Sequence, residues 1–151
     1  MSRQSASAVV VVSAILLVAA ACGGDDDRLS RGELIEQGDA ICTDYEARID
    51  AVSEPTNADD IQRYVDEVKP IVEGGTNELD NLTPPEDLED EYDEWIALTR
   101  RGLGSLDELK AAAAAGDEQR IQEIVQGLDD AEAEADRIAQ GIGFQECGEK
   151  S

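Results

Sequence analysis

The chain has 151 residues, and its 36 acidic and 12 basic side chains give it a formal net charge of −24. Such an acidic surface repels phosphate, which argues against nucleic-acid binding and against electrostatic docking onto anionic lipids. The sequence contains no histidine, so it excludes histidine-based nucleophile relays and histidine-ligated metal sites. Ala, Leu, Ile and Val dominate the apolar residues, and together with abundant Glu they favour helices within a single domain.

The first 21 residues have the pattern of an export signal. One arginine precedes an uncharged, largely apolar run over residues 6–21, and three alanines lead directly to Cys22. A basic start, an apolar segment and small residues before a cleavage point define such signals. A cysteine at that point predicts a lipoprotein with its lipid on Cys22, although Ala19 replaces the usual leucine three residues earlier. The alternative is an uncleaved membrane-spanning helix, for which the uncharged residues 4–24 are just long enough.

Residues 22–29 form the predicted link between this anchor and the domain. Two glycines and three aspartates follow Cys22, and this composition is typical of a flexible, hydrated tether. Acyl chains on Cys22 would hold the chain to a membrane through burial of CH₂ groups, each worth about 0.8 kcal/mol. The helical domain is expected to span residues 30–148.

Two helices are predicted in the first half of this domain. Ser30 and Glu33 form a capping box that starts the first helix, which stops before Pro55. Asn57 is the expected N-cap of the second helix. Its apolar stripe keeps phase past Pro70 and the glycines at 74–75, so we expect one helix that bends there.

Two further helices are predicted in the second half. Thr83 is the expected N-cap of the third helix, with prolines after it, and Gly116 is expected to end that helix. The fourth helix is expected to begin at Asp117 and to close at Gly141. Its predicted apolar stripe consists of Ile121, Ile124, Val125, Leu128, Ala131, Ala135 and Ile138.

The connections between these four helices are short. Short connections make consecutive helices antiparallel neighbours, so we predict an all-α fold, an up-down-up-down four-helix bundle. In that arrangement the fourth helix ends near the start of the first. Six residues after Gly141 then bring Cys147 back towards Cys42 on the apolar side of the first helix.

A disulfide between Cys42 and Cys147 is therefore expected outside the cytoplasm, where such bonds persist. It would close a loop of roughly 100 residues and stabilise the fold by up to about 4.7 kcal/mol in the chain-entropy model. The alternatives are a redox pair or a metal-thiolate site. The absence of a Cys-x-x-Cys motif and of histidine weakens both.

Three segments together resemble a group of small actinobacterial lipoproteins. They are the Ala-Cys-Gly-Gly-Asp-Asp-Asp stretch around Cys22, the Asp-Ala-Ile-Cys sequence that ends at Cys42, and the Gly-Phe-x-x-Cys-Gly tail around Cys147. The resemblance covers both ends of the mature domain. It implies export, a helical fold and the disulfide, and it carries no catalytic residue over.

Candidate chemistry is sparse. The acidic cluster of Glu89, Asp90, Asp93 and Glu94 offers paired carboxylates, but these lie off the apolar stripe, where ionised surface groups are expected. The acids at residues 25–27 and 86–94 do not match a calcium-binding loop, so no metal, cofactor or catalytic site is predicted. The aromatic residues are expected either in the core or around a small-ligand pocket: Tyr45, Tyr64, Tyr92, Trp95 and Phe144.

Three functions follow as hypotheses. The first is a non-enzymatic binding or adaptor module, held by lipid on the outer face of the cytoplasmic membrane, whose partner the sequence does not identify; an envelope protein is one candidate. The second is a small-ligand carrier or sensor with a cavity beside the second helix, near Pro70. The third is an envelope hydrolase that uses only carboxylates, which requires buried acids that converge in a cleft.

Overall fold

The computed structural model describes residues 27–148, and in this part of the chain all regular structure is helical. The predicted signal peptide and Cys22 lie outside the described residues. The four α-helices are joined by short segments, and one turn of 3-10 helix, η1, precedes the third. The elements are α1 (Arg31–Asp50), α2 (Ala58–Asp80), η1 (Glu86–Leu88), α3 (Glu89–Ala115) and α4 (Glu118–Ile142).

Side chains cap three of these helices, two of them as predicted. The Ser30 hydroxyl accepts the backbone N–H of Glu33, and the Glu33 carboxylate accepts the backbone N–H of Ser30, so the capping box at α1 is confirmed. The Asn57 side chain accepts two backbone N–H groups in the first turn of α2. Asp117 caps α4 in the same way. These bonds satisfy backbone N–H groups in the first turn, which have no hydrogen-bond partner within the helix.

The second helix is continuous through Pro70 and through Gly74 and Gly75. The two glycines therefore do not break it. A Cβ atom at position 75 would lie 2.7 Å from the Tyr45 ring, whereas one at position 74 would meet nothing within 4 Å. Gly75 thus allows an aromatic ring of α1 to rest on the backbone of α2.

The predicted start of the third helix is wrong. Thr83 is not an N-cap; its carbonyl accepts the backbone N–H of Leu29 at 2.8 Å. The Pro84 carbonyl accepts a hydrogen bond from the Arg28 guanidinium at 3.0 Å. The incoming chain therefore pairs with this extended segment, and the prolines disfavour helix before them. Arg28 and Leu29, which the prediction placed in the tether, lie against the domain.

The end of α4 also differs from the prediction. Gly141 remains in the helix, and Gly143, with a φ of 111°, ends it in the left-handed conformation that favours glycine. Ile142 is fully buried, so the longer helix adds a core contact. Val125, predicted in the apolar stripe, is 41% exposed, while Ile124 beside it faces the core.

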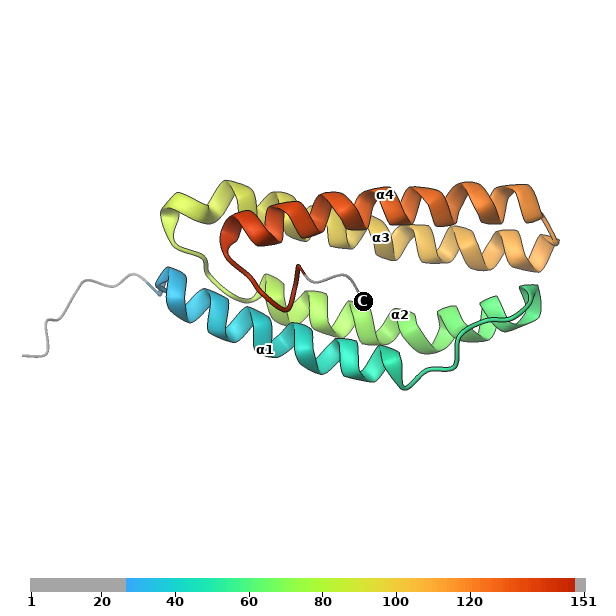
Figure 1. Ribbon diagram of the computed structural model, residues 1–151, viewed down its shortest axis with the longest axis horizontal. Coiled ribbons are helices and arrows are strands. Elements are labelled where there is room, and N and C mark those ends of the chain that lie inside the picture. Colours follow the sequence, from blue (N-terminus) through green and yellow to red (C-terminus); the bar gives the residue numbers. More distant parts are fainter. Residues whose placement is uncertain (1–26, 149–151) are drawn as a thin grey trace, which may run out of the picture.

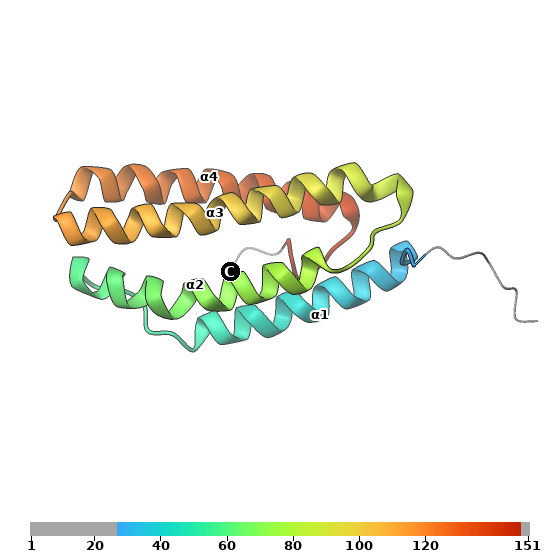
Figure 2. The ribbon, with the colours of Figure 1, turned by 180° about the vertical axis from the view of Figure 1, so that it is seen from behind.

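The helices pack chiefly on their neighbours in the sequence. α1 lies beside α2, and α3 lies beside α4 (Figure 1), and Figure 2 shows the same two pairs from behind. α2 also packs along α3. α1 and α4 make far fewer direct contacts, and the tail after α4 turns back towards α1 (Figure 1).

Two separate clusters of buried residues fill the interior. The larger one, here named the disulfide-end core, contains Leu34, Cys42, Leu79, Leu88, Tyr92, Trp95, Ile96, Ala139, Ile142, Phe144 and Cys147. The smaller one, named the far-end core, contains Val65, Leu109, Ala112 and Ile124. The candidate site lies between them.

Candidate functional site

The tail that follows α4 closes one end of the site. Cys147 is bonded to Cys42, with 5.2 Å between their Cα atoms, and both are buried, which confirms the predicted pairing. The Asp39 carboxylate accepts the backbone N–H groups of residues 145–147. Phe144 packs against the backbone of Gly38, where a Cβ atom would lie 2.3 Å from its ring. Three independent contacts thus hold the tail on α1.

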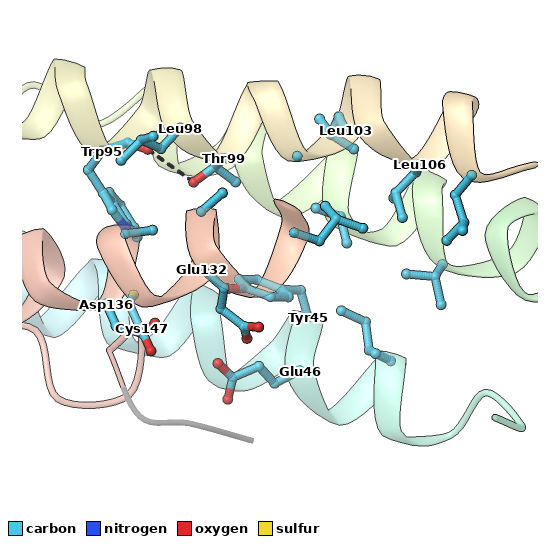
Figure 3. A pocket seen from close by; sticks show the side chains of 18 of the residues that line it. Tyr45, Glu46, Trp95, Leu98, Thr99, Leu103, Leu106, Glu132, Asp136 and Cys147 are labelled. Atoms are coloured by element: carbon cyan, nitrogen blue, oxygen red, sulfur yellow. Dashed lines mark hydrogen bonds between the residues drawn. The ribbon is translucent and has the colours of Figure 1, made fainter. Parts of the chain in front are cut away.

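A cavity of about 450 Å³ lies between the disulfide-end core and the far-end core. All four helices and Cys147 contribute to its lining, and Figure 3 shows side chains from α1, α3 and α4 around it. Its volume lies within the range of roughly 300–1,000 Å³ that is usual for small-molecule sites. The apolar side chains of the wall are Ile49, Val68, Val72, Leu98, Leu103, Leu106, Leu109, Leu128, Ala131 and Ala135.

The aromatic residues divide between this cavity and the core. Tyr45, Tyr64 and Trp95 line the cavity. Tyr92 and Phe144 pack with Trp95 in the disulfide-end core, with ring centroids 5.1 to 6.4 Å apart. Tyr45 and Tyr64 thus lie at the cavity, and Tyr92 and Phe144 lie in the core. Trp95 belongs to both, because it packs in the core and also contributes to the cavity wall.

Four carboxylates also line the cavity: Glu46 and Asp50 of α1, and Glu132 and Asp136 of α4. We name these four residues the acidic rim. Figure 3 shows Glu46 and Glu132 on facing helices, with their carboxylates directed towards one another. Among the described residues that line the cavity, none is basic.

Burial and this negative charge act together on the tyrosines of the cavity. Burial, followed by the charges of Glu46, Glu132 and Asp136, raises the pKa of Tyr45 to about 12. Burial likewise raises the pKa of Tyr64, with Glu54 and Asp50 adding to the effect. Both effects disfavour the negatively charged phenolate, so the folded protein favours the neutral phenol at Tyr45 and Tyr64.

The core tyrosine has a different environment. The Tyr92 hydroxyl donates a buried hydrogen bond of 2.6 Å to the carbonyl oxygen of Leu79. Burial raises the pKa of Tyr92, and Asp80 and Asp93 contribute. This hydroxyl ties α3 to the end of α2, and it does not line the cavity.

The acids that the sequence singled out lie elsewhere. Asp90, Asp93 and Glu94 are exposed on α3, and Glu89 pairs with Arg28 at 2.9 Å. None of the four lines the cavity. Within residues 27–148 no group of three acidic or cysteine side chains is arranged to hold a metal ion.

Sequence reasoning missed the acidic rim. Its members carry only a weak signal, since Glu46 follows Tyr45 and Glu132 follows Ala131 at the border of the apolar stripes. Val68 and Val72 flank Pro70 and line the cavity, so the hollow does lie beside α2. The other three helices also contribute to its lining, and the charges around it were not foreseen.

No protein family, curated protein or solved structure matches this chain. None of the helices described in residues 27–148 combines the length and the apolar character needed to cross a bilayer.

Proposed function

We propose that this chain is an extracytoplasmic lipoprotein, anchored by lipid on Cys22, that binds a small apolar ligand and catalyses no reaction. The observation that carries the proposal is the apolar cavity of about 450 Å³ with Tyr45, Tyr64 and Trp95 in its wall. An apolar ligand that displaces water from such a wall gains about 25 cal/mol for each Å² removed from water.

The helices are proposed to form an up-down-up-down bundle whose fourth side, between α1 and α4, is its loosest. The short connections and the packing of consecutive helices support this arrangement. The rim residues Glu46 and Glu132 come from these two helices. A ligand would therefore enter between α1 and α4, beside the tail that Cys147 ties down.

The surface favours a small ligand over a protein partner. Protein interfaces commonly use a contiguous apolar patch. Within residues 27–148 Val125 is the one large apolar side chain that is exposed. The apolar surface is instead gathered inside the cavity, where a small molecule can reach it. The lipid would place this cavity at the outer face of the cytoplasmic membrane.

Binding of the neutral fluorophore N-phenyl-1-naphthylamine tests this function. The purified lipidated protein is placed on phosphatidylcholine vesicles, and probe emission is excited by energy transfer from Trp95, the single tryptophan of the chain. We expect saturable transfer with one probe per protein. Vesicles without protein give the background.

Two variants on α4 supply a matched control. Ala131 lines the cavity, whereas Ala133 is exposed on the same helix and does not. Ala131→Phe should fill the cavity and lower probe affinity at least about tenfold, a loss of about 1.4 kcal/mol. Ala133→Phe should bind like the unaltered protein. Equal binding by both variants, or no saturable transfer at all, would reject the cavity as a binding site.

The anchor needs its own test. Intact-mass analysis of the protein purified from its native host should show a chain that begins at Cys22 and carries added acyl mass. A chain that begins at Met1, or a processed chain without acyl groups, contradicts the lipoprotein assignment. Either result would leave the cavity proposal to stand on the binding data alone.

A further inference from the structure

The cavity is long and narrow, and its long axis follows α3. The residues of α3 that line it recur on one face of the helix from Trp95 to Leu109. Figure 3 shows part of this row, from Trp95 past Thr99 and Leu103 to Leu106. The row covers about four helical turns, which is about 21 Å at the rise of an α-helix. The cavity volume of about 450 Å³, divided by that length, gives a mean cross-section of about 21 Å².

Buried residues close both ends of this row. Trp95 belongs to the disulfide-end core and is 3% exposed, and Leu109 belongs to the far-end core and is 7% exposed. Between them, Thr99, Leu103 and Leu106 are half-buried. The two cores therefore limit how long a molecule bound along α3 can be.

Gly102 keeps the middle of the cavity open. It lies halfway along the row, and the nearest atom to a Cβ atom built there is Cδ2 of Leu128, at 4.0 Å. A larger side chain at this position would project into the cavity and divide it into two shorter spaces. Gly104 does not line the cavity, and a Cβ atom there would meet nothing within 4 Å.

We infer that the ligand has a single long, unbranched hydrocarbon chain, which lies extended along α3 between the two cores. The inference rests on the proposed function and adds a ligand class to it. With C–C bonds of about 1.5 Å and near-tetrahedral angles, an extended chain of about 16 carbon atoms matches the length of the row. The narrow cross-section admits one such chain and excludes two side by side.

Dodecan-1-ol and cyclododecanol test the width of the site. Both are neutral, with the same number of carbon atoms and one hydroxyl group, but the ring places two chain segments side by side. Each is mixed into phosphatidylcholine vesicles that carry the lipidated protein, and displacement of the flat fluorophore N-phenyl-1-naphthylamine is measured. Dodecan-1-ol should act at about a tenfold lower mole fraction in the membrane, because each CH₂ group left outside the cavity weakens binding about fourfold.

Straight-chain alcohols of increasing length test the closed ends. From decan-1-ol to hexadecan-1-ol, each added CH₂ group is buried equally in the bilayer and in the cavity, so these alcohols should act at similar mole fractions. Octadecan-1-ol and eicosan-1-ol are longer than the row. They should require at least about tenfold higher mole fractions, since two or more CH₂ groups stay outside the cavity.

Two glycine variants of α3 test where the chain lies. Gly102→Leu should divide the cavity, whereas Gly104→Leu adds the same side chain at an exposed position outside it. A ligand that binds the folded state raises its stability. Dodecan-1-ol should therefore raise the urea midpoint of the unaltered protein and of Gly104→Leu, and leave that of Gly102→Leu unchanged. Cyclododecanol at the same mole fraction gives the effect of the membrane alone.

The outcomes are distinct. Equal displacement by dodecan-1-ol and cyclododecanol, or the absence of a length limit, overturns the inference and leaves a site for apolar molecules in general, so the proposed function survives. Equal stabilisation of both glycine variants also overturns it. If Gly102→Leu does not unfold cooperatively, the alcohols on the unaltered protein decide. Failure of the fluorophore itself to bind would instead remove the proposed function.

Discussion

The two ends of the domain are built differently. The disulfide-end core joins fully buried residues of all four helices and the tail, including the Cys42–Cys147 bond and three packed aromatic rings. The far-end core has four buried residues, and leucines around it are only half-buried. One end thus has the dense packing of a stable core, and the other leaves the space that forms the cavity.

The far end is held partly by charges at the surface. Lys69 pairs with Asp107 at 2.6 Å, and Lys110 pairs with Asp66, so that both pairs link α2 to α3. Such exposed pairs stabilise a fold by only about 0–1 kcal/mol each. The comparison indicates that stability is concentrated at the disulfide end, while the binding space lies towards the weaker end.

The same substitution made at both ends tests this difference most strongly. Leu34→Ala removes a fully buried side chain of the disulfide-end core and should cost about 4 kcal/mol of unfolding free energy. Leu109→Ala acts in the far-end core beside an existing cavity and should cost only about 2 kcal/mol. Urea unfolding followed by circular dichroism measures both. Equal losses would contradict the proposed division between the ends.

Removal of the disulfide should cause the next largest loss of unfolding free energy. The double variant Cys42→Ala, Cys147→Ala opens a loop that spans 105 positions and should cost about 2–4 kcal/mol. It should also release the tail, so protease cleavage after Glu146 should become faster than cleavage near Gly116 at the far end. An unchanged urea midpoint would show that the bond adds little to the disulfide-end core.

Two adjacent glycines of α2 should differ in how an alanine at each position changes the unfolding free energy, and these changes are smaller. Gly75→Ala places a methyl group 2.7 Å from the Tyr45 ring and should destabilise the fold by about 1–3 kcal/mol. Gly74→Ala meets no neighbour and should stabilise the helix by up to about 1 kcal/mol. Changes of the same sign in both variants would mean that Tyr45 does not rest on α2.

The smallest expected change in stability comes from the ionisation of Tyr45 in the cavity wall at alkaline pH. The pKa of Tyr45 lies at about 12 in the folded protein, against an ordinary value of 10.0. The folded state therefore favours the neutral phenol, and this stabilisation is present below pH 10 and is lost as the pH rises through about 12. The difference in phenolate absorbance between the protein and Tyr45→Phe isolates this group. Ionisation of Tyr45 near pH 10 would place it in water.

Local signals in the sequence predicted much of the fold. Ser30, Asn57 and Asp117 each sit at a helix start because their side chains satisfy backbone amides within three residues. Gly116 ends α3 in the left-handed conformation for an equally local reason. Cys42 and Cys147 were the two cysteines left in the domain, which reduced the pairing to one choice.

The errors arose where contacts distant in sequence decide the structure. Thr83 has the composition of an N-cap, but pairing with Leu29 holds it extended. The contact at Gly75 was not foreseen, because it is made by a tyrosine thirty residues earlier in the chain. The acidic rim was unpredictable for the same reason, because Glu46 and Glu132 meet only when α1 and α4 are placed on either side of the cavity.

Quenching of the emission of Trp95 by the neutral ligand 10-bromodecan-1-ol tests the central claim most directly, because bromine quenches an indole only at close contact. Trp95 is the single tryptophan and lies in the cavity wall. We predict saturable quenching with one ligand per protein, retained in Ala133→Phe and lost in Ala131→Phe. Quenching that is absent, or that is the same in both variants, would contradict a ligand site between the two cores.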